Sequence, residues 1–273
     1  MSLKHLLPTF RNRFRFILRS VEDHCKAKKC NNILNLGTGE GDYDRDLSQF
    51  AHVVTACDIN PNDIENAKSI NQDVSEIRYE VKDALDTGYP AGQFDIIVCT
   101  EVIEHVENSK LLLREISRLI ASNGIVFMTY PRLKFPISYD PVNYLWHKLG
   151  NKTPIINQGA YAFGHKQLID DEIFLSMASD CGLQVQDSIP LSGYLIGLLE
   201  MYWTGIFQYH FKSNRSNEMG VSKNPLTIVP KTSKIPYLSK FTDLIIWLDR
   251  SLFNSKKHSI GMGVILTKAK IIS

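Results

Sequence analysis

The chain has 273 residues, of which 44% are hydrophobic and 22% are charged, and it contains 16 glycines and 11 prolines. This composition is ordinary for a globular protein and excludes disordered, collagen-like and linker-dominated chains. The net charge of +2 is unevenly distributed, with +6 in residues 1–30, −11 in residues 31–190 and +7 in residues 191–273. An acidic centre between basic ends disfavours nucleic acid as a partner of the central part.

The chain has five cysteines, and this odd number without a C-x-x-C pair disfavours a disulfide framework or a structural zinc site. Such cysteine usage favours a reducing compartment, so we expect a cytoplasmic protein. The N-terminus lacks a short apolar core followed by a small-residue cleavage site, and we expect no secretory signal. No run of 18 uncharged apolar residues occurs, which disfavours a plain membrane-spanning helix.

Apolar residues at steps of three and four predict an amphipathic helix within residues 1–30, whose regular part begins at Pro8. Its apolar face consists of Leu3, Leu6, Leu7, Phe10, Phe14, Ile17, Leu18 and Val21. Arginines at positions 11, 13, 15 and 19 flank this face. Two interpretations are open, a helix packed on the domain or a basic helix lying on an anionic membrane or over an acceptor.

From residue 32 onward, predicted strands alternate with predicted helices. The strands are expected at residues 33–36, 52–57, 77–81, 94–100 and 125–130, and the helices at residues 42–50, 61–69 and 109–120. Asn60 is expected to cap the helix that begins at Pro61, and Asn123-Gly124 to end the one over 109–120. Alternation of this kind predicts an α/β fold, with a parallel sheet covered by helices on both faces.

The remaining segments extend this sheet and interrupt it. Residues 131–164 have no clear period and are expected beside the ligand cleft, a helix is predicted over 166–181, and two further strands over 183–189 and 263–267. Four parts are therefore predicted. They are an N-terminal basic helix (1–30), a cofactor-binding core (31–190), an apolar and basic helical insertion (191–258) and the final strand of the sheet (259–273).

A glycine-rich turn follows the first predicted strand of the core. Gly37, Gly39 and Gly41 come between that strand and the helix predicted over 42–50. Glycines at such a turn let the backbone bend tightly and approach a ligand closely. This spacing differs from the G-x-G-x-x-G pattern of dinucleotide-binding proteins, and Glu40 lies inside the turn. A carboxylate there would repel a pyrophosphate but suits a cationic sulfonium, which favours S-adenosylmethionine over NAD.

Polar residues also stand where the next predicted strands end. Asp58 ends the second strand and can accept hydrogen bonds from both hydroxyls of a ribose. Asp83 and Ala84 follow the third strand, where an acidic group can accept from an adenine amino group, and Thr100 and Glu101 end the fourth. Since the carboxyl ends of parallel strands share one edge of the sheet, these residues predict a single nucleoside-binding site.

These motifs resemble those of the class I S-adenosylmethionine-dependent methyltransferases. The similarity covers residues 30–190 and is closest to the branch with the ubiquinone-pathway O-methyltransferases, through residues 101–106 (Glu-Val-Ile-Glu-His-Val). The resemblance implies a Rossmann-like, doubly wound sheet of seven strands with S-adenosylmethionine as cofactor. The cofactor-binding residues it implies are Asn35, Gly37, Thr38, Gly39, Gly41, Asp58, Ile59, Asp83, Ala84, Thr100 and Glu101. Asn35 stands where many members have Asp or Glu.

The acceptor side is expected directly after the fourth strand. If a helical turn begins at Glu101, then Glu104 and His105 share its side, and His105 suits proton removal from an acceptor hydroxyl. His165 is a second candidate, at the start of the helix predicted over 166–181. In the related small-RNA 2′-O-methyltransferases, a similar Glu-x-x-Glu-His and a later His hold magnesium, so these four residues could bind a divalent metal. A third interpretation is that the Glu-His pair only supports the strand end.

We predict an enzyme that transfers a methyl group from S-adenosylmethionine to an oxygen or nitrogen of a small or lipid-linked acceptor. The alternatives are a metal-assisted RNA methyltransferase and a non-catalytic cofactor-binding protein. The segment 189–211 is apolar apart from Glu200, and Tyr202, Trp203 and Tyr209 suit headgroup depth. The insertion is predicted to dip into the inner face of a membrane as a hairpin, together with residues 1–30. Otherwise it forms a lid or a dimer surface.

Overall fold

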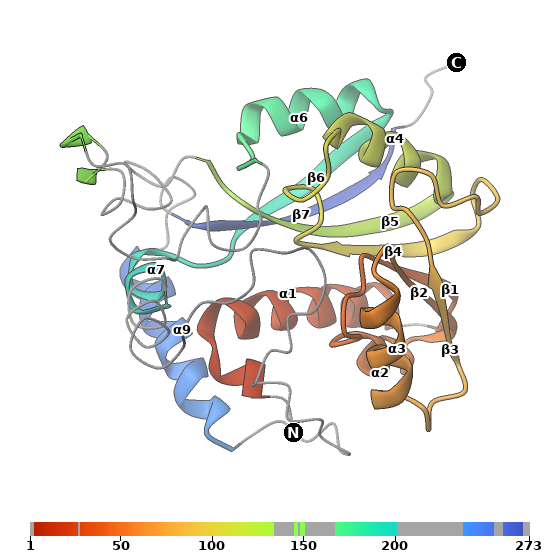
Figure 1. Cartoon of the computed structure of the whole chain (residues 1–273), viewed down its shortest axis with the longest axis horizontal. Coiled ribbons are helices and arrows are strands. Elements are labelled where there is room, and N and C mark those ends of the chain that lie inside the picture. The colour runs from red at the N-terminus through yellow and green to blue at the C-terminus, as the bar shows by residue number, and fades with distance from the viewer. Residues whose placement is uncertain are drawn as a thin grey trace.

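The computed structural model describes residues 3–26, 28–133, 145–146, 148–150, 167–200, 237–253 and 259–269. Within these residues, seven strands form one sheet in the order β3-β2-β1-β4-β5-β7-β6 (Figure 1). The strands are β1 (Cys30–Leu36), β2 (Ala51–Asp58), β3 (Ile77–Val81), β4 (Phe94–Thr100), β5 (Ile120–Pro131), β6 (Leu183–Pro190) and β7 (Gly261–Lys268). The predicted seven-stranded α/β sheet is confirmed.

Strands β1 to β5 pair in parallel, whereas β7 runs antiparallel to both of its neighbours, β5 and β6. The last two predicted strands, β6 and β7, pair with each other from Leu183 opposite Lys268 to Pro190 opposite Met262. The strand order reverses between β1 and β4. In open α/β sheets, a ligand crevice forms at the carboxyl ends of the strands beside such a reversal.

Helices cover both faces of the sheet. They are η1 (Leu3–Leu6), α1 (Pro8–His24), α2 (Asp44–Leu47), α3 (Pro61–Ile70), α4 (Ser109–Leu119), α6 (Asp171–Asp180), α7 (Tyr194–Leu198) and α9 (Ser239–Phe253). Helices α4 and α6 pack on one face, and α1 and α2 pack on the other (Figure 1). The predicted cap is confirmed, since the Asn60 side chain accepts a hydrogen bond from the backbone N–H of Asn62.

Three predicted helices have other bounds in the structure. Helix α2 covers only Asp44–Leu47 of the residues 42–50 predicted. Helix α4 ends at Leu119, because Ile120 already pairs with Phe94 in β5, and the chain bulges before Ile125 pairs with Ile96. Helix α6 begins at Asp171 rather than 166, because the N–H of Ile169 bonds to the carbonyl of Pro131 and holds the preceding segment beside the end of β5.

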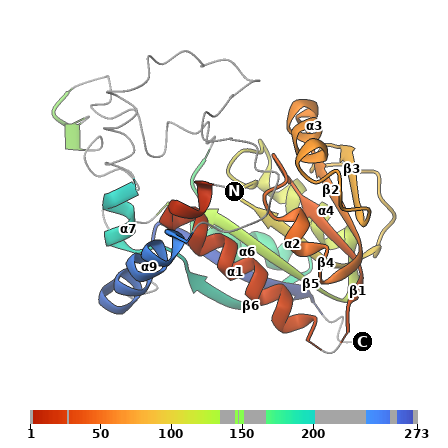
Figure 2. The same ribbon diagram turned by 90° about the horizontal axis from the view of Figure 1, so that it is seen from below.

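Helix α1 packs against the sheet, which is the first of its two interpretations. Phe14, Ile17 and Val21 are buried in the core between this helix and the sheet. Gly263 of β7 makes room for it, because a Cβ atom there would lie 2.6 Å from Phe16 Cε1. Figure 2 shows α1 crossing this face, with α7 and α9 beside its N-terminal half.

The start of the predicted membrane hairpin lies against α1. Glu200 accepts a hydrogen bond from the backbone N–H of Thr9 at 2.7 Å and another from its hydroxyl, so it caps the first turn of α1. Glu200 therefore faces α1 in this structure. Residues 201–236, with Tyr202, Trp203 and Tyr209, lie outside the described part of the chain. Among the described helices, none is long and apolar enough to span a membrane.

Candidate functional site

The glycine turn after β1 adopts the backbone conformation that its sequence predicts. Gly37, Gly39 and Gly41 have φ angles of 78°, 54° and 81°. A Cβ atom on Gly37 would lie 2.3 Å from Cγ2 of Val102 in the loop after β4, whereas one on Gly39 would meet nothing within 4 Å. Gly37 therefore permits close packing of two loops, and Gly39 leaves open space of the kind that a ligand needs.

Asp58 fixes this glycine turn from the neighbouring strand. Its Oδ2 accepts a hydrogen bond from the Gly39 N–H at 2.9 Å, and its Oδ1 accepts one from the Asn60 N–H at 3.0 Å. Each carboxylate oxygen has a second lone pair, so the group can still accept from two ligand hydroxyls. Asp58 thus orients the turn and can still accept hydrogen bonds from a ligand.

A buried polar network lies beneath the turn. Asn35 is fully buried, and its Nδ2 donates to Asp44 Oδ1 at 2.6 Å and to Thr38 Oγ1 at 3.0 Å. The Thr38 hydroxyl donates to Asp44 Oδ2 at 2.8 Å. Burial raises the pKa of Asp44 to about 6, although the hydrogen bonds from Asn35 and Thr38 oppose that rise. Asn35 and Thr38 therefore support the turn from within, through a carboxyl group that sequence analysis did not identify.

Lys4 of η1 lies beside the glycine turn. Its Nζ is 2.9 Å from Glu40 Oε2 and 2.5 Å from Asp42 Oδ2. Burial acts to lower the pKa of Lys4, but the two carboxylates raise it overall. Because Glu40 is paired with Lys4, its charge by itself does not distinguish S-adenosylmethionine from NAD.

The ends of β2 and β3 present exposed groups at the same edge. Asp58 pairs with Val81 in the sheet, two residues before Asp83. Asp83 is exposed, and its Oδ1 accepts from the Leu85 N–H at 2.9 Å. Ile59 is 67% exposed, next to the Asp58 carboxylate. The Asp83 carboxylate could accept a hydrogen bond from the polar edge of an aromatic base, and the Ile59 side chain could pack against the face of that base.

The end of β4 is strained at Glu101. With φ of 54°, it is the one residue other than glycine with positive φ in the described part of the chain. Its Oε1 accepts from the Thr129 hydroxyl at 2.9 Å, and its Oε2 lies 2.5 Å from a guanidinium nitrogen of Arg13 in α1. Such backbone strain persists where the surroundings impose it and is concentrated at functional sites. Arg13 and Thr129 were not predicted, and nothing in the local sequence links them to Glu101.

No helical turn begins at Glu101, because its φ angle is positive. Glu104 and His105, which were expected to share one side of such a turn, differ in their exposure. Glu104 is fully buried, whereas the His105 side chain is 42% exposed. Among the described residues, neither carboxylate oxygen of Glu104 has a hydrogen-bond partner, and Oε1 lies 3.9 Å from Nε2 of His105. Burial, and then the charge of Glu101, raise the pKa of Glu104 well above its usual range. At this edge a buried carboxyl group, whose neutral form is favoured by burial, therefore lies behind an accessible imidazole.

Gln167 closes the loop that carries these two residues. Its backbone N–H donates to the carbonyl of Glu104 at 3.3 Å, and its Nε2 donates to Ser109 Oγ at 2.6 Å and to the carbonyl of Ile103 at 3.2 Å. This residue was not predicted either. The second catalytic candidate, His165, lies outside the described residues.

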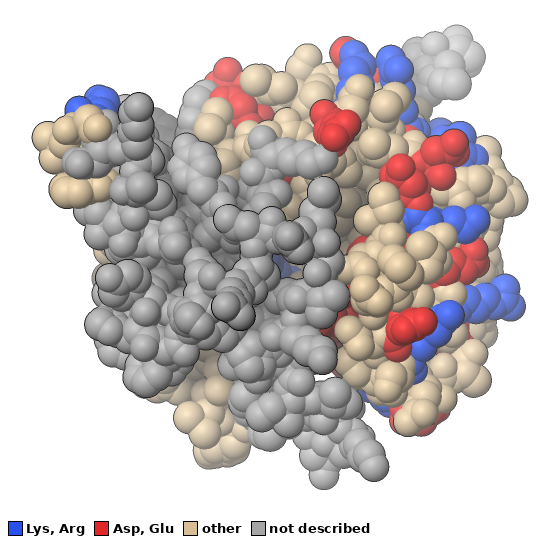
Figure 3. Space-filling view, in the orientation of Figure 1, with Lys and Arg blue, Asp and Glu red and all other residues tan. Residues whose placement is uncertain are grey.

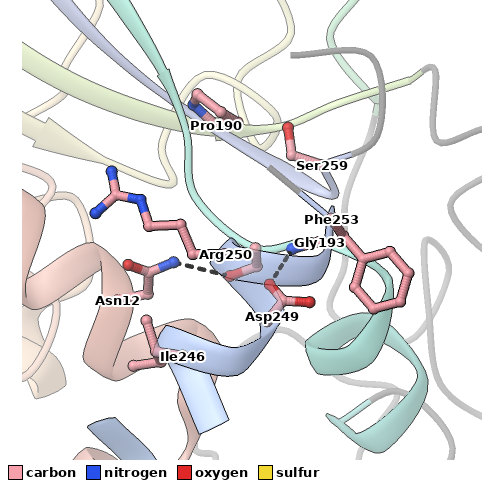
Figure 4. Close-up of a pocket in the computed structure, with 9 residues that line it drawn as sticks. Asn12, Pro190, Gly193, Ile246, Asp249, Arg250, Phe253 and Ser259 are labelled. Atoms are coloured by element: carbon pink, nitrogen blue, oxygen red, sulfur yellow. Dashed lines mark hydrogen bonds between the residues drawn. The ribbon is translucent and has the colours of Figure 1, made fainter. Parts of the chain in front are cut away.

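No cluster of three His, Cys, Asp or Glu side chains suited to a metal occurs among the residues that the structure describes. Glu101, one of the four predicted metal ligands, is engaged by Arg13 and Thr129. A small pocket does lie between α1, α7 and α9, where Asn12 donates to Ser192 and Gly193 to Asp249 (Figure 4). None of the predicted cofactor or acceptor residues lines it.

Comparison with known proteins agrees with this fold. Residues 34–128 match the family model for a methyltransferase domain. A ubiquinone biosynthesis O-methyltransferase of Pseudomonas paraeruginosa is 26% identical over 165 residues, which are 59% of this chain and 67% of the relative. One from Coxiella burnetii is 29% identical over 113 residues, 41% of this chain and 48% of the relative. This chain thus matches only about half to two thirds of the length of these curated relatives.

A solved structure of similar fold is the N-methyltransferase NodS of Bradyrhizobium japonicum in complex with S-adenosyl-L-homocysteine. It has 18% sequence identity and a TM-score of 0.51, over 70% of this chain and 83% of that chain. At this identity the likeness concerns the fold alone. The likeness supports the fold, and the domain match together with the two relatives shows that the chain contains a class I S-adenosylmethionine-dependent methyltransferase domain.

Proposed function

We propose that the chain transfers a methyl group from S-adenosylmethionine to an oxygen, or a nitrogen, of a small or lipid-linked acceptor. The observation that carries this proposal is the glycine turn, where Asp58 holds the N–H of Gly39 and open space faces the Cα of Gly39. The names of the two relatives, ubiquinone biosynthesis O-methyltransferases, support an oxygen as the methyl acceptor. The protein would be cytoplasmic and peripheral on the inner face of a membrane.

The cofactor would be held by three groups of residues. The glycine turn and Thr100 would hold its methionine part, Asp58 its ribose, and Ile59, Asp83 and Ala84 its adenine. When bound, the cofactor supplies an electrophilic methyl group on a sulfonium. The chain's own contribution would be to orient the acceptor and to exclude water, since in-line displacement depends mainly on positioning.

His105 would accept the proton that leaves the acceptor hydroxyl. Its imidazole is accessible, and the neutral form of Glu104 can face it without the cost of a buried unpaired charge. Arg13 holds the carboxylate of Glu101 at the end of β4, and so would keep that group in one position during turnover. Glu101 is thus assigned a positioning role beside the reacting groups.

Metal-assisted methylation of RNA is the less favoured alternative. Acidic and basic side chains are interspersed on the face in Figure 3, over the part of the molecule with α3 and α4, whereas RNA binding needs basic side chains gathered together. A non-catalytic cofactor-binding protein would share the cofactor site. It would bind S-adenosylmethionine without transferring the methyl group, and an activity assay distinguishes it from the proposed enzyme.

The test is incubation of the full chain with methyl-labelled S-adenosylmethionine and fractionated cell extract. We expect label in the lipid or small-molecule fraction, and loss of labelling in the Asp58→Ala variant. Label in RNA that survives deproteinisation would support the alternative instead. Calorimetric binding of S-adenosylmethionine with no label in any fraction would favour the non-catalytic protein.

A further inference from the structure

Helix α9 presents its apolar residues away from the protein. The side chains that it buries are Ser239, Thr242, Ile246 and Asp249, three of which are polar. Its outward face carries large apolar side chains that are each exposed by 37% to 67%, namely Phe241, Leu244, Trp247, Leu248 and Leu252. This is the reverse of the usual surface helix, which turns its apolar side to the core.

Polar contacts fix the inward face of α9 and so determine which side faces out. Asp249 accepts from the backbone N–H groups of Gly193 at 2.6 Å and Leu195 at 2.9 Å, and thereby caps α7 (Figure 4). The Thr242 hydroxyl donates to the carbonyl of Leu6 at 3.3 Å. Because these bonds require the polar face to point inward, rotation of α9 to bury its apolar face would leave them unmade.

The acidic side chains of α9 are also used inside the protein. Asp243 pairs with Arg11 at 3.0 Å and with Arg15 at 2.8 Å, both on α1, and Asp249 caps α7. Of the two basic residues of the helix, Lys240 is exposed beside this outward face, whereas Arg250 lines the pocket between α9 and α1 (Figure 4). The outer surface of α9 is therefore apolar and aromatic with one cation, Lys240, and at the lower left of Figure 3, where Figure 1 places its N-terminal end, no acidic side chain is visible.

We propose that the outward face of α9 docks on the surface of an anionic lipid bilayer. Interfacial helices combine large apolar and aromatic side chains with Lys or Arg, which attract anionic headgroups. Tyr237 adjoins this face and suits headgroup depth, and Lys240 lies over its ring, 4.5 Å from the ring centroid. This proposal rests on the peripheral location included in the proposed function, and it assigns that location to one helix.

Helix α9, rather than α1, is the docking element. Three of the four arginines that made α1 a basic helix have partners inside the protein, with Arg11 and Arg15 on Asp243 and Arg13 on Glu101. The same pairs place α1 between α9 and the acceptor side of the site. A bilayer in contact with α9 would therefore lie one helix away from the place where a lipid-linked acceptor must enter.

The test is flotation of the full-length protein with vesicles of phosphatidylcholine alone or mixed with phosphatidylglycerol. We expect flotation with the anionic vesicles that weakens with added salt. Phe241→Ser/Trp247→Ser should lower the partition coefficient at least tenfold. Lys240→Gln should lower it by roughly fivefold, since one cation that meets the membrane contributes about 1 kcal/mol.

The matched control is Ile173→Ser/Leu175→Ser on α6, which removes two apolar side chains that are 59% and 46% exposed. It should float like the wild type. Calorimetric binding of S-adenosylmethionine to each variant shows that the fold is intact. It also separates the two proposals, because a failed cofactor site would leave flotation unchanged.

Quenching of tryptophan fluorescence by brominated lipid tests the location directly. Wild-type quenching should fall in Trp247→Phe, a variant that keeps an apolar side chain at this position. Absence of flotation at low salt, or equal flotation of the α9 and α6 variants, would overturn the proposal. So would a wild-type dimer that the Phe241→Ser/Trp247→Ser change converts to a monomer without affecting flotation, because the face would then bind a second copy.

Discussion

The two halves of the sheet edge are built differently. At the ends of β1 and β2, the polar groups of the cofactor half hold one another, with Asp58 on the Gly39 N–H and Asn35 and Thr38 on Asp44. At the end of β4, Glu101 is held in a strained backbone conformation, and the Glu104 carboxyl group is buried with no hydrogen-bond partner among the described residues. The first half is organised before any ligand binds, whereas the second keeps groups in costly states, which is typical of the place where chemistry occurs.

The halves meet at Gly37 and Val102, where the missing Cβ of the glycine lets the loop after β4 approach the glycine turn. Each half, and the contact between the two, can therefore be tested by its own substitution. Substitutions in the acceptor half should reduce turnover and spare cofactor affinity. Those in the cofactor half should reduce cofactor affinity or stability.

The largest effect is expected for His105→Ala, which removes the proposed proton acceptor. Turnover should fall by about 10²–10⁴, as expected for a general base, while the affinity for S-adenosylmethionine stays within about twofold, a difference of under 0.5 kcal/mol. Steady-state methyl transfer and calorimetry measure the two quantities. His52→Ala, which removes an exposed histidine on β2, is the matched control. A fully active His105→Ala enzyme would remove this residue from the mechanism.

Gly37→Ala should break the contact between the halves. Left-handed φ costs alanine about 1–2 kcal/mol, and the overlap with Val102 adds roughly 1–3 kcal/mol of overpacking. Gly39→Ala has the same backbone cost and no overlap, so the difference in the free energy of unfolding isolates the contact. Adding Val102→Ala to Gly37→Ala should recover part of the loss. Equal unfolding free energies for the two glycine variants would contradict the close approach.

Asp44 gives the cofactor half a pH dependence of its own. Its pKa is about 6 in the folded protein, against the ordinary value of 3.8 that applies to the unfolded chain. At a pH between these two values, the folded state therefore binds an additional proton. The free energy of unfolding should therefore fall as pH rises from about 4 to about 6, by up to about 3 kcal/mol. Asp44→Asn does not titrate, so its stability relative to wild type should increase over this window. Parallel denaturation profiles of the two proteins would refute the assignment.

The sequence predicts the parts of this molecule that depend on local pattern. The alternation of strands and helices, the Pro8 start of α1 and the Asn60 cap of α3 are each encoded within a few residues. The start of β5 was missed because its pairing with Phe94 is a long-range contact. Periodicity within 109–120 cannot report such a contact.

In the candidate site too, the residues that the sequence predicted lie in local motifs, and those that it missed come from distant parts of the chain. The glycine turn and Asp58 follow from strand ends that the sequence marks, and their geometry was predictable. Lys4 and Arg13 reach the site from the N-terminal helices, and no spacing relates them to Glu40 or Glu101. The role of Glu200 as a cap of α1 could not be predicted for the same reason, because it depends on a helix N-terminus that is distant in the sequence.

In the proposed enzyme, the edge formed by the glycine turn and Asp58 binds S-adenosylmethionine. Calorimetric titration of wild type and Asp58→Ala with S-adenosylmethionine tests it most directly, with Glu65→Ala on the exposed side of α3 as the control. We predict saturable binding to the wild type, the same affinity in the control and a loss of about 1.5–3 kcal/mol in Asp58→Ala, the range for a hydrogen bond to a charged group. Equal affinity in all three proteins, or displacement of the ligand by NAD, would contradict the claim.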